Sequence, residues 1–575
     1  MGKIFNRALS FTTGDSLIPD LILAASAVLL TTACGLPFLR SSRGRALTRL
    51  SLSFTLGCVL LIISGIAGGL TGIDPLIPQT SLLVICLAAC VYGFAHRSMD
   101  IKRLDRDDLI AIGMAALYLV VGVIFFNRIS MWMGGDAVAH AELIRTLLDG
   151  EKLPVGLPRV GSYWEYYPKG FHHYAYPFAR MFSVEDVIQV LPVVITSVTP
   201  LLIYSIVRET RAEAATYATL LATFLFPAHY SHLIWGGYPT ATAEMLLVAS
   251  VLSCIVEIRA LPVMLLGALL AHARVLAISI AVLSSWAAAA NLRRFRRIHQ
   301  QLLLITTVAM LALYIMLHRP DYLISVFGDR IQASDFVARW YPSILALLGG
   351  IIAFMRDERL DRMALAWAGA VIAVVLLADS GPLSFIGTPD RILLELYLPL
   401  SILGALALSR MDSGDLGLRR AFLLALLLVG VVSMMVVLES YAGSWGMPRE
   451  DHDAIMWIKA QNMSDAVCVN LDETGAWIYP LTGVRVARGR FTGGFSYPLP
   501  GMVIRDPNDP TVLEALERLG RRNVLIYVSS VSISRPGHVP PFAEHAGAFP
   551  TVNMSFSPEH YDLVYDRGAR IYRFR

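Results

Sequence analysis

The sequence has little charge for its length. Only 16% of its 575 residues are Asp, Glu, Lys or Arg, whereas a soluble domain usually carries about a quarter. Hydrophobic residues make up 55%, and the mean hydropathy is +0.59. These values exclude an ordinary water-soluble enzyme and predict a chain that lies mostly in a lipid bilayer.

Cysteine and basic runs are scarce too. The sequence has six cysteines with no Cys-x-x-Cys or Cys/His ligand spacing, so we expect neither a disulfide framework nor a structural zinc site. The net charge of +4 comes from scattered arginines, so nucleic acid is not an expected partner. The usual nucleotide-binding and hydrolase motifs, such as GxGxxG, GxSxG and HExxH, are absent.

Apolar runs long enough to cross about 30 Å of hydrocarbon recur along the chain. Two shorter runs, 261–271 and 275–291, flank His272-Ala273-Arg274 and predict two short helices that meet near the outer surface. With them, we expect a polytopic α-helical membrane protein of about fourteen transmembrane helices. The longer spans are expected near 17–39, 51–71, 80–96, 109–127, 185–206, 213–232, 239–257, 301–317, 342–355, 363–378, 391–409 and 421–438.

The arginines predict the orientation, because short loops rich in Lys and Arg stay cytoplasmic. Every second connection is basic, beginning with those that follow the first, third and fifth spans. The other connections, including 128–184, and everything after Val437 are therefore expected outside the cytoplasm, as are both termini. The first span shows no cleavage pattern of a removed signal peptide. We expect a multi-pass protein of the inner (plasma) membrane with an extracytoplasmic active site.

The last part of the chain differs in composition, with more charge and shorter apolar runs. We expect a transmembrane domain over 1–443 and an extracytoplasmic soluble α/β domain over 444–575. Glu450–Gln461 and Thr511–Leu519 have helical spacing, whereas Ala466–Leu471 and Asn523–Ser529 are typical of buried strands. Segments 561–565 and 569–574 flank Asp566-Arg567-Gly568 and predict a hairpin that closes the sheet.

The outer connection 128–184 contains the first candidate site. Asp136 and His140 lie four residues apart, so they share a face of a short amphipathic helix that we expect on the membrane surface. Asp136 is a candidate general base or metal-binding carboxylate, and the alternative is a helix cap, a role that does not exclude catalysis. His140 is a candidate catalytic residue, and the alternative is a supporting structural role.

An aromatic stretch follows in the same connection, from Tyr163 to Tyr174. Clustered aromatics often form an interfacial belt, but a belt does not require the charged and imidazole side chains found among them. These four side chains are candidates for binding a sugar or a phosphate: Glu165, Lys169, His172 and His173.

Glu244 stands near the start of an apolar span, where an ionisable group is costly and usually faces a polar cavity. It is the second candidate acid, and the alternative is a favourable interaction with the positive end of its own helix. A bound lipid phosphate would need cationic partners, for which Arg274 and Arg391 are the candidates. The alternative for either arginine is to reach lipid headgroups or to pair with Asp390.

Three features together resemble the GT-C superfamily of membrane glycosyltransferases: the outer connection with Asp136, the broken helix pair at His272-Ala273-Arg274, and the outer C-terminal domain. The resemblance is architectural and covers about residues 105–440. These enzymes use lipid-phosphate-linked sugars, and their first outer loop carries an acidic residue needed for catalysis, which the Asp136 connection resembles. Pro389-Asp390-Arg391 resembles a late segment near the donor. Here a single Asp136 replaces the usual acid pair, and four spans rather than one precede it.

The resemblance implies transfer of a sugar from a polyprenyl-phosphate donor to a glycan, lipid or protein acceptor. Asp136 would deprotonate or orient the acceptor and His140 would position it. Glu244 and the histidines would shape the sugar site, and Arg274 and Arg391 would neutralise the leaving phosphate. A divalent cation, Mg or Mn, is left open, with Asp136 and Glu244 as its candidate ligands.

Two other readings remain at the sequence level. Ionisable residues in or near spans, such as Asp20, Glu244 and Glu257, also occur in transporters and flippases, although we find no internal repeat. A non-catalytic scaffold would tolerate loss of Asp136. An enzyme requires Asp136, His172, Glu244, Arg274 and Arg391 to converge on one outer site.

Overall fold

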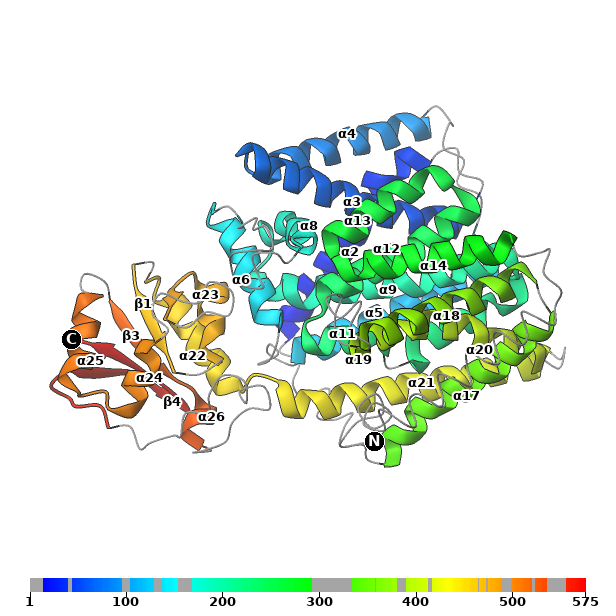
Figure 1. Ribbon diagram of the computed structural model, residues 1–575. Coiled ribbons are helices and arrows are strands. Elements are labelled where there is room, and N and C mark those ends of the chain that lie inside the picture. The colour runs from blue at the N-terminus through cyan, green and yellow to red at the C-terminus, as the bar shows by residue number, and fades with distance from the viewer. Residues whose placement is uncertain are drawn as a thin grey trace.

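The chain is mostly helical and ends in a small sheet (Figure 1). A computed structural model describes residues 14–39, 44–95, 104–128, 136–151, 153, 168–226, 228–291, 333–356, 358–379, 389–411, 416–463, 465–471, 474–487, 498–519, 523–534 and 555–575. The predicted span 301–317 and the candidate residue Glu165 lie outside these ranges.

Nine helices within these ranges are long and apolar enough to cross a membrane, and three shorter apolar helices accompany them. The prediction of many apolar helices is confirmed, but the number fourteen is not. The helices of this part are α2 (Gly14–Gly35), α3 (Ala46–Thr71), α4 (Leu76–Ala95), α5 (Arg106–Arg128), α9 (Val184–Thr210), α10 (Ala215–Leu220), α11 (Ala228–Trp235), α12 (Tyr238–Val256), α13 (Leu261–Ala271), α14 (Ala273–Asn291), α17 (Ala333–Arg356), α18 (Arg359–Asp379), α19 (Pro389–Leu393), α20 (Tyr397–Met411) and α21 (Leu416–Trp445).

The predicted span 213–232 is wrong as a single helix. It consists of α10, a π-helical segment over Leu221–Leu225, and α11 after an extended residue at Phe226. Pro227 follows in the sequence, and proline has no N–H with which to continue a helix. The predicted break between 261–271 and 275–291 is confirmed, since His272 is extended between α13 and α14.

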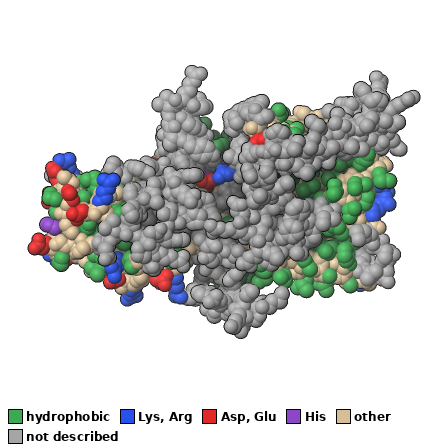
Figure 2. All heavy atoms as spheres, turned by 60° about the horizontal axis from the view of Figure 1, so that its bottom comes forward, with side chains coloured by type: hydrophobic (Ala, Val, Ile, Leu, Met, Phe, Trp, Pro, Cys, Tyr) green, Lys and Arg blue, Asp and Glu red, His purple; other side chains and the backbone are tan. Residues whose placement is uncertain are grey.

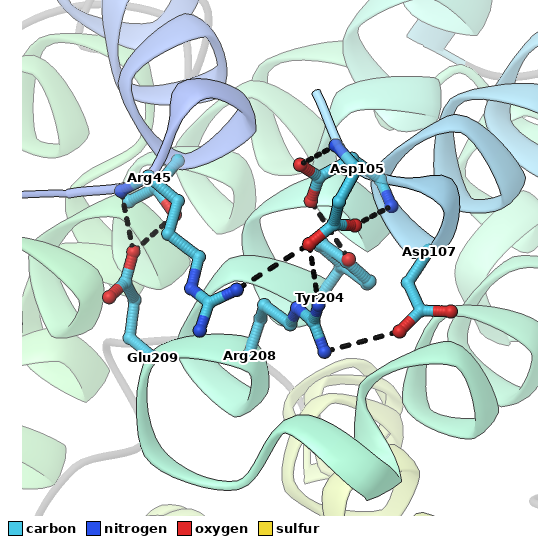
Figure 3. A network of polar contacts seen from close by, with 8 residues as sticks. Arg45, Asp105, Asp107, Tyr204, Arg208 and Glu209 are labelled. Atoms are coloured by element: carbon cyan, nitrogen blue, oxygen red, sulfur yellow. Dashed lines mark hydrogen bonds and ion pairs between the residues drawn. The ribbon is translucent and has the colours of Figure 1, made fainter. Parts of the chain in front are cut away.

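The connections predicted to be cytoplasmic meet at one end of the helical part. Arg208, near the end of α9, lies 2.6 Å from Asp105 and 3.2 Å from Asp107 at the start of α5. Glu209 accepts a hydrogen bond from the backbone N–H of Arg45 before α3 (Figure 3). Three connections that are distant in the sequence therefore share one side, as the alternation of basic connections requires.

The opposite end of α9 points to the C-terminal region. Ser183 and Asp186 form a capping box that starts α9, and Glu185 in its first turn lies 2.9 Å from His452. Nearby, Asp74 between α3 and α4 accepts a hydrogen bond from Tyr176. The 27 residues of α9 thus separate the two sets of connections by about 40 Å at 1.5 Å per residue.

Large apolar side chains face outward on the helical part, whereas charged side chains gather on the C-terminal region (Figure 2). Val91 on α4, Met355 on α17 and Leu424 on α21 are about 70% exposed, at 69%, 72% and 66%. Such a surface is costly in water and suits lipid.

The C-terminal region contains a five-stranded sheet of order β2-β1-β3-β5-β4. β1 pairs in parallel with β2 and β3, and β5 runs antiparallel to β3 and β4. The predicted buried strands, helices and hairpin are confirmed, and β2 was not predicted. The elements are α22 (Arg449–Ala460), β1 (Val467–Asn470), α23 (Ile478–Thr482), β2 (Arg485–Val486), α24 (Pro498–Arg505), α25 (Pro510–Arg518), β3 (Val524–Val528), α26 (Ser530–Ser534), β4 (Tyr561–Arg567) and β5 (Ala569–Phe574).

Two short helices of the outer connection, α6 (Asp136–Leu148) and α8 (Gly170–Ala179), lie between the helical part and the C-terminal region (Figure 1). The prediction of a helix from Asp136 is confirmed. Its predicted exposure as an amphipathic surface helix is wrong, because every residue from Ala137 to Ile144 is buried. Helices α8, α9 and α23 pack around it, so protein rather than solvent covers its polar side chains.

Candidate functional site

Asp136 is the first residue of α6 and is half-buried. Its carboxylate acts electrostatically on Tyr238, the first residue of α12. Gly236 lies against this helix start with φ +82°, and a Cβ there would come within 2.3 Å of the Ala137 nitrogen. Glycine at 236 therefore allows the α11–α12 connection to approach Asp136 closely.

One turn further along α6, the buried His140 meets His172 of α8. Their Nδ1 and Nε2 atoms are 2.9 Å apart, so one nitrogen donates and the other accepts. We call these two residues the histidine pair. Burial lowers the pKa of His140 to about 3 and that of His172 well below its usual value, and the nearby Lys169 ammonium acts in the same direction. Both imidazoles are therefore neutral near pH 7.

The other two predicted residues of this stretch occupy different surroundings. Lys169, just before α8, is buried and its charge reaches all three histidines. His173 is buried on the side of α3, where its ring lies 3.5 Å from the position of a Cβ on Gly69. Burial and Lys169 lower the pKa of His173 to about 4. His173 thus packs against α3 rather than joining the histidine pair.

A second buried polar group lies among the apolar helices. Oε1 of Glu244 on α12 is 2.8 Å from Nε2 of His232 on α11. Arg274 at the start of α14 donates to Thr240 at 3.4 Å, and its Nε lies 3.8 Å from Glu395. Glu395 and Glu244 interact electrostatically. We call Glu244, Arg274 and Glu395 the acid–arginine cluster.

His272 connects the two groups. Its imidazole lies within electrostatic range of His140 in the outer connection and of Arg274, His232 and Arg391 in the helical part. Arg391, on α19, is exposed. The structure thus brings His140, Arg274 and Arg391 around His272, with His172 adjoining through His140 and Glu244 through His232. The sequence-level alternative in which Arg274 reaches lipid headgroups is wrong, since Arg274 is buried.

Sequence reasoning missed three residues of this group: His232, Glu395 and Tyr397. Glu395 is a carboxylate with no exposure, located between α19 and α20. The rule that singled out Glu244, an acid within an apolar segment, applies equally to Glu395. Tyr397 interacts with Glu244 and shares a 3.2 Å hydrogen bond with His229. A tyrosine in an apolar run carries no comparable signal, because tyrosine is common in buried cores.

The described residues do not provide a set of ligands for Mg or Mn. No group of three or more His, Cys, Asp or Glu side chains in these ranges is arranged to hold a metal ion. Asp136 begins α6, whereas Glu244 is engaged by His232. Binding of a cation by Asp136 and Glu244 therefore stays a prediction.

The arrangement can perform acid–base chemistry next to an anion. Asp136 lies one turn before His140, whose imidazole pairs with that of His172, and His272 lies within electrostatic range of His140 and of both Arg274 and Arg391. The carboxylate can accept a proton, the pair can orient a hydroxyl, and the guanidinium groups can neutralise a phosphate. Burial strengthens the interactions of His140, His172 and Arg274, because their surroundings have a low dielectric constant.

No protein-family model matches this sequence, and no curated protein matches it. Among solved structures, the chain is similar to a crystal structure of the oligosaccharyltransferase of Archaeoglobus fulgidus in complex with zinc and sulfate. The identity is 14% and the TM-score 0.39, over 74% of this chain and 68% of that one. Because the TM-score is below 0.5, function has to be inferred from the residues of this chain.

Proposed function

We propose that this chain is an integral-membrane glycosyltransferase that transfers a sugar from a polyprenyl-phosphate donor to an acceptor on the extracytoplasmic face. The observation that supports this most is that His140, Arg274 and Arg391 lie within electrostatic range of His272, while Asp136 begins the helix of His140 one turn earlier and His172 pairs with His140. This grouping lies at the end of the helical part that faces the C-terminal region, within a protein whose outer surface suits lipid.

The reaction replaces one bond at the anomeric carbon of the sugar with another. The acceptor oxygen attacks this carbon while its proton passes to Asp136, and the bond to the phosphate oxygen breaks with its electron pair left on phosphate. The histidine pair orients the acceptor hydroxyl. Proton removal by a positioned base contributes about 10²–10⁴-fold to the rate of such reactions.

Arg274 and Arg391 bind the donor phosphate and stabilise the charge that develops on it. Glu395 and Thr240 hold the guanidinium of Arg274 before the donor arrives. Glu244 and Lys169 line the sugar site, and Glu165 belongs to the same outer connection. No step is assigned to a metal ion.

The remaining assignments follow from this proposal. Residues 1–443 form the membrane domain, and 444–575 form an extracytoplasmic domain that covers the outer connection. The protein resides in the inner (plasma) membrane, with lipid, the donor and a glycan, lipid or protein acceptor as its partners. The basic connections that meet near Arg208 face the cytoplasm.

The test is transfer from a panel of radiolabelled polyprenyl-phosphate sugars, with and without chelator. It uses membranes that contain the wild-type chain, Asp136→Asn, or Glu151→Gln as a control. Glu151 is an exposed acid that follows α6 and pairs with Arg485 at the surface. We expect product with the wild type and the control, and a rate at least about 10²-fold lower with Asp136→Asn at equal protein levels.

The outcomes separate the candidate functions. Product that is independent of Asp136 contradicts the catalytic assignment. Movement of labelled lipid across vesicles without any product identifies a flippase or transporter instead. Loss of product on chelation shows that a divalent cation takes part.

A further inference from the structure

The end of α6 remote from Asp136 is held by the C-terminal region. Residues at the end of α6 contact α23, a short helix that follows β1 in the sheet. The hydroxyl of Tyr479 on α23 donates a 3.0 Å hydrogen bond to Asp149, which directly follows α6. Asp149 in turn lies 2.9 Å from the guanidinium of Arg145 in the last turn of α6.

Gly483 completes this contact. It ends α23 with φ +79°, and a Cβ there would lie 2.6 Å from Nη2 of Arg145. The absence of a side chain thus leaves space for the guanidinium that pairs with Asp149. One carboxylate oxygen of Asp149 accepts the hydrogen bond from Tyr479, and the other forms an ion pair with Arg145. The hydrogen bond from Tyr479 thus fixes the last turn of α6 relative to the C-terminal region, while Arg145 holds the accepting carboxylate in place.

These contacts are partly shielded from water. Tyr479 is only 8% exposed, and burial raises its pKa to about 12, so the hydroxyl keeps its proton and remains a donor. The neighbouring ion pair of Arg485 and Glu151 joins the same two parts but is exposed. Exposed pairs contribute little to stability, whereas a buried hydrogen bond to a carboxylate contributes more.

The sheet topology accounts for the position of α23 against α6. The segment that leaves the carboxyl end of β1 forms α23 and then enters β2. In sheets with parallel strands this edge commonly binds ligands. Here the described part of that edge packs against α6 through α23. The face of the C-terminal region that could hold a small molecule therefore contacts the helix that carries Asp136 and His140.

We infer that the C-terminal region sets the position of α6 through Tyr479, which makes Tyr479 a positioning residue for the transfer reaction. The inference rests on the proposed function, because α6 begins with the proposed base. A helix of 13 residues transmits a shift of its last turn to its first turn, and a catalytic carboxylate tolerates little displacement.

The test compares Tyr479→Phe and Gly483→Ala with the wild type in the full-length protein in nanodiscs. The control is Arg485→Ala, which breaks the exposed pair at the same contact. Two quantities are measured: hydrogen exchange of a peptide that covers 136–148, and kcat and KM for the donor. We expect faster exchange in α6 and a kcat lowered about tenfold with KM unchanged in both variants, since one hydrogen bond to a charged group is lost or disturbed. Arg485→Ala changes neither.

The exchange measurement does not depend on catalysis. If the wild type transfers no sugar, the proposed function fails. The exchange rate of α6 still shows whether Tyr479 stabilises that helix. Unchanged exchange in Tyr479→Phe overturns the inference. Faster exchange with unchanged kcat shows that Tyr479 is structural only and also overturns its positioning role. A raised KM with unchanged kcat assigns the residue to donor binding instead and likewise contradicts the inference.

Discussion

Nδ1 of His140 lies 2.9 Å from Nε2 of His172, and the two residues come from different helices of one outer connection. Burial keeps both rings neutral, so the pair shares a single N–H between the two nitrogens. This contact fixes the orientation of His140 one turn after Asp136. It ties α8 to the helix that begins with the proposed base.

Substitution of His172 by Gln should lower transfer about 10-fold to 100-fold, because His140 loses its partner and its orientation. The same change at His560, a half-buried residue in the turn before β4, serves as the control and should have no effect. Initial rates in membranes with equal protein levels measure this. A wild-type rate in His172→Gln would remove the histidine pair from the mechanism.

The histidine pair also predicts a pH dependence of stability. An imidazole with a lowered pKa stays neutral when folded but binds a proton when unfolded. The folded state therefore loses stability as the pH falls from the usual histidine value near 6.5 towards about 3. Melting temperatures between pH 7 and pH 4 should fall less steeply in His140→Gln than in the wild type. An equal change of melting temperature with pH in the two proteins would contradict the burial of a neutral His140.

Gly236→Ala should impair both folding and transfer. The new Cβ would meet the backbone of α6 at 2.3 Å, and φ +82° is unfavourable for alanine. Strain of this kind typically costs about 1–3 kcal/mol. Gly113→Ala and Gly369→Ala are matched controls, since a Cβ at either position meets nothing within 4 Å. Thermal melting in detergent checks this, and a Gly236→Ala protein as stable as the controls would disprove the close approach.

The contact between His452 and Glu185 should weaken as the pH rises. Burial by itself lowers the pKa of His452, but the hydrogen bond and charge of Glu185 outweigh it and raise the pKa above 6.5. The contact thus stabilises the folded protein fully below about pH 6.5, and this stabilisation is lost as the pH rises through the raised pKa of His452. Protease sensitivity near residue 447 should increase with pH in the wild type, and His452→Gln should show no such dependence.

The acid–arginine cluster gives a further test of stability. Removal of the Arg274 guanidinium leaves the Glu395 carboxylate buried without its partner, and the loss of one partner of a buried ion pair typically costs about 3–5 kcal/mol. Arg274→Met should therefore lower the melting temperature strongly, and Arg274→Met with Glu395→Leu should recover much of the loss. Neither protein should transfer sugar, because the phosphate contact is absent in both. A double variant no more stable than the single one would contradict the pairing.

The parts that the sequence predicted are those that local pattern determines. Hydropathy indicated the apolar helices, and the alternation of basic connections anticipated that Arg45, Asp105 and Arg208 share one side. Residue type and context also singled out His140, His172 and Arg274. The interruption before α11 was missed because composition shows an apolar run even where the backbone becomes π-helical and extended.

Contacts between distant segments could not be predicted in the same way. The burial of α6 depends on α23, more than three hundred residues later in the chain, and a single sequence carries no sign of that pairing. The same holds for Glu395 beside Arg274 and for His173, which neighbours His172 in sequence but packs against α3. Side-chain type limits what a residue can do, whereas tertiary packing decides which partner it has.

Donor binding and transfer measured on one purified preparation test the central claim most directly. The account predicts that Asp136→Asn binds a radiolabelled polyprenyl-phosphate sugar within about threefold of the wild type while its transfer rate falls by at least about 10²-fold. Wild-type transfer by Asp136→Asn would contradict the account.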